Sequence, residues 1–125
     1  MIQIATAVFI GGGLGSLLRL WIQQQFNPAQ PSEFPTGTFV VNLIGCLLIG
    51  IFWGWSEKSM TLTPTFKFFL FTGICGGFTT FSAYSQESLL LLRNAQLSFF
   101  IFYVIGSVIG GMLLTYIGFR LLTHS

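Results

Sequence analysis

Long apolar runs separated by short polar connectors make up most of the sequence. Four runs are long enough to cross a membrane, at about residues 2–25, 37–55, 66–92 and 97–122. A transmembrane helix needs about 20 mostly apolar residues, so each run predicts one membrane-spanning helix. The pattern therefore predicts an all-α integral membrane protein with four transmembrane helices, forming a single domain over residues 1–125.

The connectors carry residues that end or begin helices. Residues 27–36 hold three of the four prolines and predict a stiff, extended loop. In residues 56–65, Thr63 predicts an N-cap and Pro64 the first position of the third helix. Residues 93–96 predict a tight turn. Little chain is left outside the spans, so no soluble domain is expected.

Composition supports the membrane assignment. The chain is 53% hydrophobic and 6% charged, whereas about a quarter of a soluble domain is charged. The two cysteines, Cys46 and Cys75, fall in different spans without a matching set of ligands. We interpret them as small buried apolar residues rather than as a disulfide or a metal site.

The basic residues give almost no signal for orientation. With the amino terminus inside, Lys58, Lys67 and Arg120 lie on the inner side, and Arg19 and Arg93 on the outer side. Membrane orientation follows the asymmetry of Lys and Arg between the two sides. A chain this evenly charged is able to insert both ways, which favours an antiparallel homodimer of oppositely oriented copies.

The third run is longer than one crossing requires. As a continuous helix, its 27 residues would extend about 40 Å, against a hydrocarbon core of about 30 Å. A break at Gly76-Gly77 would absorb the excess, and backbone carbonyls freed in this way form cation sites in membrane proteins. The alternative is a glycine pair that is only flexible or tightly packed.

Polar and aromatic residues share one face after these glycines. Phe81, Tyr84, Ser85 and Ser88 recur at helical spacing. The edge of an aromatic ring is electropositive, and hydroxyl groups donate hydrogen bonds. Both kinds of group are able to face an anion without carrying a charge.

Neighbouring spans offer further neutral donors. Asn42 is an amide deep in the second span, where it requires partners. Tyr103, Ser107 and Thr115 fall along one side of the fourth helix, with Gly111 at the missing place. Serine and threonine also join helices in membranes, but three spans with neutral donors and few acids favour a polar path for an anion.

Two segments resemble a known family. FPTGTFVVNLIG (34–45) and GICGGFTTFSAYSQE (73–87), with GGGLGSLLR in the first span and the hydroxyl stripe of the fourth, closely resemble the Fluc/CrcB family of bacterial fluoride channels. The resemblance implies a passive fluoride-selective channel, not an enzyme, that exports fluoride across the bacterial plasma (inner) membrane. It further implies an antiparallel dual-topology homodimer in the lipid bilayer with two pores. No nucleic-acid partner is expected.

The resemblance also assigns residues to roles. It implies a fluoride pore lined by Asn42, Phe81, Ser82, Tyr84, Tyr103, Ser107 and Thr115. It implies a structural sodium ion at the dimer interface, held by main-chain carbonyls of Gly76 and Thr79. Arg19 matches a basic residue at the end of the first helix, either as an attractor of anions at the pore mouth or as a side chain that extends to the membrane surface.

Two positions depart from the family pattern. Tyr84 stands where the family usually has phenylalanine, which keeps the ring edge and adds a hydroxyl. Gly111 stands where the polar stripe often has a hydroxyl, so that water or backbone would serve there instead.

Glu87 is the acid at membrane depth, and it keeps a second function open. It faces a vestibule or pairs with a basic group in one interpretation, and is a proton site in the other. A proton site would favour a proton-coupled antiporter for fluoride or a small molecule, of the small four-span dimer type. A non-conducting subunit of a larger complex is a further alternative.

Overall fold

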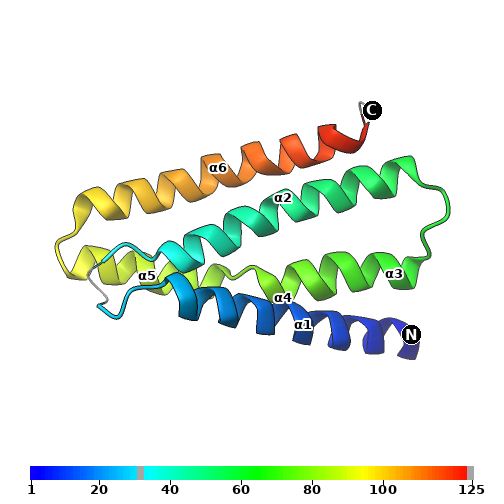
Figure 1. Cartoon of the computed structure of the whole chain (residues 1–125), viewed down its shortest axis with the longest axis horizontal. Coiled ribbons are helices and arrows are strands. Elements are labelled where there is room, and N and C mark those ends of the chain that lie inside the picture. Colours follow the sequence, from blue (N-terminus) through cyan, green and yellow to red (C-terminus); the bar gives the residue numbers. More distant parts are fainter. Residues whose placement is uncertain (31–32, 124–125) are drawn as a thin grey trace.

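A computed structural model describes residues 1–30 and 33–123 as an elongated bundle of helices (Figure 1). Three helices are long and apolar enough to cross a membrane: α1 (Ile2–Phe26), α2 (Thr36–Lys58) and α6 (Leu97–Thr123). The part of the chain that the structure describes contains no strand. The all-α fold and the positions of these three spans are therefore confirmed.

The third span is divided into four short elements. They are α3 (Pro64–Phe68), the π-helix η1 (Phe69–Cys75), α4 (Gly76–Phe78) and α5 (Phe81–Arg93). Thr63 accepts a hydrogen bond from the amide of Phe66 at 3.2 Å, which confirms the predicted N-cap. π-helical turns are often found at functional sites.

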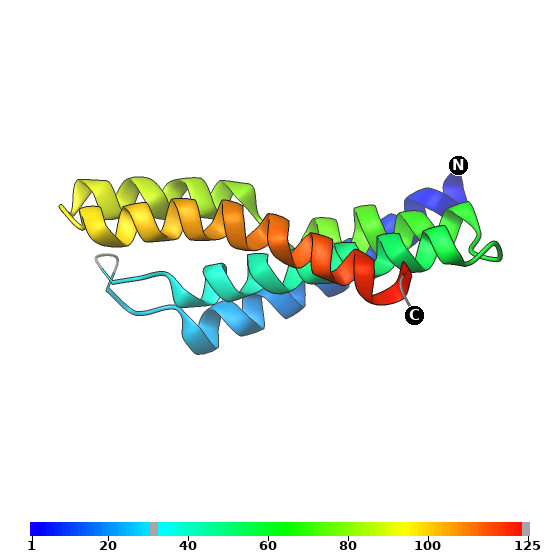
Figure 2. The ribbon, with the colours of Figure 1, turned by 90° about the horizontal axis from the view of Figure 1, so that it is seen from above.

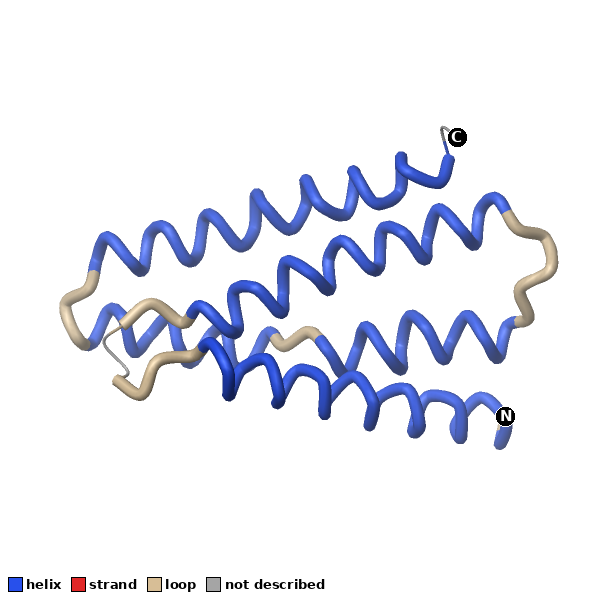
Figure 3. The backbone as a smooth tube through the Cα atoms, viewed as in Figure 1, coloured by secondary structure: helices blue, strands red, loops and turns tan. Residues whose placement is uncertain are grey.

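The break lies three residues later than predicted. Gly76 and Gly77 are helical, whereas Thr79 and Thr80 have extended backbones, seen as the loop within the third span in Figure 3. Gly77 serves helix contact instead: a Cβ there would strike the carbonyl of Gly12, and one on Gly15 of α1 would strike that of Ile74. A Cβ on Gly76 would make only an ordinary contact. Small residues allow such close approach of helix backbones in a membrane.

Threonine side chains stabilise both helix ends at the break. The hydroxyl of Thr79 donates to the carbonyl of Cys75 at 2.8 Å, at the end of α4. The hydroxyl of Thr80 accepts from the amide of Ala83 at 3.1 Å and caps α5. Thr79 thus adds its hydroxyl to a carbonyl that its own amide also reaches at 3.0 Å, whereas the hydroxyl of Thr80 takes the place of a backbone acceptor for α5.

The third span changes its neighbour at the break. Before it, η1 and α4 pack against α1, and after it α5 packs against α6, while α2 packs along α6 (Figures 1 and 2). Glycines again permit the contact between α2 and α6: a Cβ on Gly50 would strike the backbone of Thr115, and one on Gly118 that of Leu47.

The connectors agree with their predictions where they are described. The turn after α5 contains Ala95 with a positive φ of 59°, and the amide of Gln96 donates to the carbonyl of Leu91 at 2.8 Å. In the proline-rich connector, residues 31–32 lie outside the described residues.

Candidate anion and cation site at the helix break

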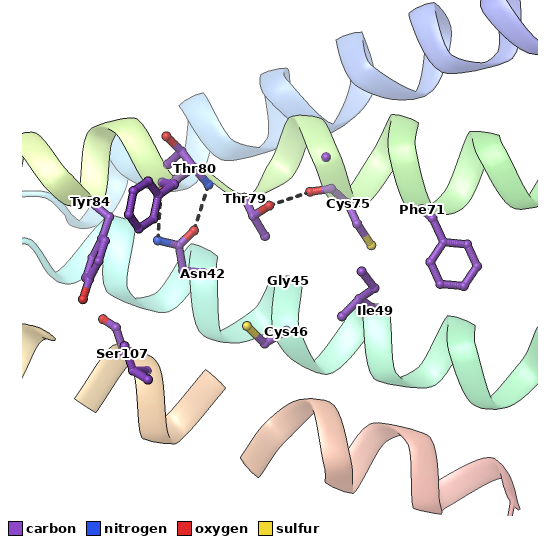
Figure 4. Close-up of a pocket in the computed structure, with 13 residues that line it drawn as sticks. Asn42, Gly45, Cys46, Ile49, Phe71, Cys75, Thr79, Thr80, Tyr84 and Ser107 are labelled. Atoms are coloured by element: carbon purple, nitrogen blue, oxygen red, sulfur yellow. Dashed lines mark hydrogen bonds between the residues drawn. The ribbon is translucent and has the colours of Figure 1, made fainter. Parts of the chain in front are cut away.

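Asn42 of α2 holds the extended backbone of the break. Its Nδ2 donates to the carbonyl of Thr80 at 3.3 Å, and its Oδ1 accepts from the amide of Thr80 at 2.9 Å (Figure 4). Both polar backbone groups of Thr80 are thereby satisfied where lipid offers no partner. Asn42 has the partners that a buried amide requires, and its second amide hydrogen has none described.

An open cavity of about 390 Å³ lies beside the break. It brings together six of the predicted site residues: Asn42, Gly76, Thr79, Phe81, Tyr84 and Ser107. None of the described residues that line it is charged. Figure 4 shows Asn42 on one wall and Ser107 on the side of α6. The wall of this cavity is mostly apolar, and the polar groups on it are neutral hydrogen-bonding groups.

Ser107 carries an unused hydroxyl at this cavity. Its Oγ is buried and is the single buried side-chain polar atom among the described residues that lacks a hydrogen-bond partner. Buried polar groups in native proteins almost always have a partner. The hydroxyl of Ser107 is therefore a donor that no described group uses.

The other predicted positions of the fourth span differ in their surroundings. Thr115 lines a second cavity of about 390 Å³ together with Ser107, and its hydroxyl donates to the carbonyl of Cys46 at 3.0 Å. Gly111 also lines it, and a Cβ there would lie 2.9 Å from the sulfur of Cys46. Cys46 thus takes the space of a hydroxyl at Gly111. Tyr103 is fully buried and lines neither cavity.

The two aromatic residues after the break differ in exposure. Phe81 is 79% exposed, and its ring centroid lies 5.8 Å from that of Tyr84. The additional hydroxyl of Tyr84 donates to the carbonyl of Val104 at 3.2 Å, so it joins α5 to α6. Ser82 is exposed, and its hydroxyl lies 3.4 Å from that of Thr80.

The carbonyl oxygens around the break are unequally used. Those of Cys75, Gly77 and Thr80 accept hydrogen bonds from side chains. Within the described residues, no hydrogen bond reaches the carbonyl oxygens of Gly76 and Thr79. Both residues line the cavity, and carbonyls of unwound helices coordinate sodium in membrane proteins. The donor set at the break therefore fits a sodium ion.

Arg19 contacts the third span. Its Nε donates to the carbonyl of Gly77 at 3.1 Å, and the hydroxyl of Ser16 donates to the same oxygen at 3.4 Å. The side chain is half-buried. The predicted role at a pore mouth stays a prediction, and the structure adds a defined partner.

Glu87 belongs to a hydrogen-bonded cluster that sequence reasoning missed in part. Its Oε2 accepts from the hydroxyl of Thr38 at 2.9 Å and from Nδ2 of Asn27 at 3.5 Å. Its Oε1 accepts from the hydroxyl of Tyr103 at 3.0 Å. Nε2 of Gln23 donates to the hydroxyl of Thr38 at 3.0 Å. Glu87 is thus paired with neutral donors from three other helices or their ends.

Asn27 has a second role in this cluster. Its Oδ1 accepts from the amide of Thr38 at 3.1 Å, which caps the first turn of α2. A Cβ on Gly37 would lie 2.7 Å from this oxygen, so glycine leaves the space for it. An amide directly before a proline, and a hydroxyl in the first turn of an apolar helix, were the available sequence signals.

The fold and the site define an α-helical integral membrane protein with a broken span beside a cavity of neutral donors. The chain belongs to the CrcB family, because the family model described as "CrcB-like protein, Camphor Resistance (CrcB)" matches residues 6–119. This confirms the resemblance seen in the sequence.

Curated relatives cover nearly the whole chain. The chain is 46% identical over 111 residues to "Fluoride-specific ion channel FluC" of Flavobacterium psychrophilum, covering 89% of this chain and 90% of the relative. It is 45% identical to the protein of that name from Oceanobacillus iheyensis, over 91% of this chain and 87% of the relative. It is 38% identical to the protein of that name from Escherichia coli strain K12, over 100% of this chain and 98% of the relative.

Proposed function

We propose that this protein is a fluoride-specific ion channel, not an enzyme, of the bacterial plasma (inner) membrane that releases fluoride from the cytoplasm. Its family and the names of its relatives support this function. The structural observation that carries it is the cavity of neutral donors beside the break, with the unpartnered hydroxyl of Ser107 on its wall.

The chemistry of the cavity suits a small anion that holds its water tightly. A pore must replace hydration with donors at successive sites and bind weakly enough for the ion to leave. The spare amide hydrogen of Asn42, the hydroxyl of Ser107 and the ring edge of Phe81 supply such donors. Neutral groups offer this replacement without a fixed positive charge that would trap the ion.

A second, antiparallel copy of the chain completes the pore in this proposal. The cavity is open on one side, and the largely exposed Phe81 lies at its wall. Polar groups facing lipid are costly, so a protein surface is needed to cover them. The nearly even distribution of basic residues allows both insertions. Two copies would form two pores, one on each side of the interface.

A structural sodium ion belongs to the same arrangement. The carbonyl oxygens of Gly76 and Thr79, which accept no described hydrogen bond, would bind it together with those of the second copy. The described residues contain no group of three or more His, Cys, Asp or Glu side chains that would hold a metal ion, so main-chain oxygens are the donors expected for a cation here.

Fluoride efflux from liposomes that contain the purified protein tests the function. With the membrane potential clamped, we expect rapid fluoride flux without chloride flux or proton movement. Obligatory proton counterflow would replace the channel with the proton-coupled antiporter, centred on Glu87. No flux from a folded dimer would overturn transport altogether and leave the non-conducting subunit.

A further inference from the structure

The carbonyl of Gly77 lies where the first half of the broken span ends. The last carbonyls of a helix have no donor within the helix, and here the chain does not continue as a helix beyond Phe78. Two side chains of α1 supply the missing donors: Nε of Arg19 at 3.1 Å and the hydroxyl of Ser16 at 3.4 Å. The Gly77 oxygen is thus held by a different helix.

The backbone of α1 is close enough for this contact because of glycines. Gly12, Gly15 and Arg19 recur at helical spacing on one face of α1. A Cβ on Gly15 would strike the carbonyl of Ile74, and one on Gly77 that of Gly12. With the backbones in contact, the inner part of the Arg19 side chain reaches Gly77. The positive charge also lies near the carboxyl end of a helix, where cations are favoured.

We propose that Arg19 is a positioning residue for the helix break. Its Nε–H holds the Gly77 carbonyl toward α1, while Asn42 holds both backbone groups of Thr80 from α2. The segment between these two anchors is fixed, and the unpaired carbonyl oxygens of Gly76 and Thr79 remain for the cavity. The effect on flux rests on the proposed fluoride channel, but the contact itself does not.

This role differs chemically from attraction of anions at a pore mouth. Attraction depends on the charge of residue 19, whereas positioning depends on a donor at Nε. Glutamine places its amide nitrogen at the same number of bonds from Cα as Nε of arginine, without the charge. Lysine keeps the charge and places a carbon atom there. The two substitutions therefore separate the two roles.

The experiment compares Arg19→Gln with Arg19→Lys in the full-length protein in liposomes. Arg93→Gln and Arg93→Lys are the matched controls, because Arg93 is exposed in the last turn of α5. Fluoride flux per dimer is measured, together with the sodium concentration that gives half-maximal thermal stabilisation. We expect Arg19→Lys to lower fluoride flux about tenfold, because that factor corresponds to the loss of one hydrogen bond. The same variant should need a higher sodium concentration for half-maximal thermal stabilisation. Because Arg19→Gln keeps a donor at this place, its fluoride flux is expected to stay within about threefold of that of the unaltered protein.

A second measurement needs no variant and no transport. The chain has three arginines, at positions 19, 93 and 120, so labelling arginine with ¹⁵N gives three Nε–H signals. We expect slow hydrogen exchange for Nε–H of Arg19 and fast exchange for Arg93. Fast exchange at Arg19, or flux that is kept by Arg19→Lys and lost by Arg19→Gln, would overturn the proposal. Absence of fluoride flux in the unaltered protein, with Nε–H of Arg19 protected, would instead refute the proposed channel and leave the positioning contact.

Discussion

The cavity beside the break and the cluster around Glu87 both place polar groups at membrane depth, and they differ in how fully these groups are used. In the cluster, the carboxylate accepts from Thr38, Asn27 and Tyr103, and the hydroxyl of Thr38 accepts from Gln23 as well. At the cavity, the hydroxyl of Ser107 has no partner among the described residues.

This difference separates structural polarity from polarity that awaits a ligand. In lipid, each polar group needs a partner from the protein or from what the protein binds. The Glu87 cluster supplies its own partners and joins α5 to α6 and to the ends of α1 and α2. The cavity leaves donors and carbonyl oxygens over, so its partners are expected from ions or a second copy.

Asn42→Asp should have the largest effect, because it attacks the cavity directly. The substitution removes the donor to the Thr80 carbonyl and places a negative charge where fluoride is expected. Like charges brought together cost several kcal/mol, so we expect fluoride flux to fall about 100-fold or more. Asn94→Asp, at the exposed end of α5, is the matched control. Flux within twofold of the control would contradict a fluoride site at Asn42.

Gly77→Ala tests the contact between the third span and α1 at the break. The added methyl group would strike the carbonyl of Gly12, and overpacking of this kind costs about 1–3 kcal/mol. We expect a lower midpoint of thermal unfolding in detergent. Gly13→Ala is the control, because nothing lies within 4 Å of a Cβ there. Equal midpoints for the two variants would show that α1 does not contact the third span at Gly77.

Glu87→Gln sharpens the contrast between the two regions. The hydroxyl groups of Thr38 and Tyr103 would donate to a neutral amide instead of a carboxylate, and hydrogen bonds to charged groups are the stronger kind. We expect a loss of about 1–2 kcal/mol in unfolding free energy, with fluoride flux per folded protein nearly unchanged. Glu57→Gln is the control. Loss of flux without loss of stability would favour the proton-coupled antiporter.

Tyr84→Phe should have the smallest effect. It removes the hydrogen bond to the carbonyl of Val104 and keeps the ring edge near Phe81. One neutral hydrogen bond contributes about 0.5–1.5 kcal/mol, so stability should fall slightly while flux is preserved. A large loss of flux in this variant would show that the hydroxyl itself takes part in conduction.

The sequence predicted the helices well because hydropathy determines where they lie. The predicted spans 2–25 and 97–122 agree with α1 and α6 to within one residue at each end. The break lies at Thr79 and Thr80 rather than at the predicted Gly76-Gly77. Glycine serves either a bend or a close contact between helices, and which of the two it serves depends on the neighbouring helix. That neighbour is distant in sequence: the contact of Ser16 with Gly77 joins residues 61 positions apart.

The candidate site was predicted in part for the same reason. Asn42 and Ser107 were identified as neutral donors, and both lie at the cavity. Asn27 and Thr38 were missed, because their common acceptor Glu87 is 49 positions from Thr38 and no periodicity within one helix reveals it. Gln23 was missed as well, and it joins the cluster through the hydroxyl of Thr38. Tyr103 and Thr115 were predicted to line the pore, and the sequence did not reveal their acceptors: the hydroxyl of Tyr103, which lines neither cavity, donates to Glu87, and that of Thr115 donates to the carbonyl of Cys46.

The two ends of the bundle have a consequence for genetic fusion. The amino terminus and the end of α6 lie at the same end of the molecule (Figure 1), as four crossings require. A short tether between two copies would therefore force them to be parallel. An antiparallel pair in one polypeptide would need a linker that itself crosses the bilayer an odd number of times. Fluoride flux through only the design with the short tether would indicate parallel copies, and flux through only the design with the membrane-crossing linker would indicate antiparallel copies.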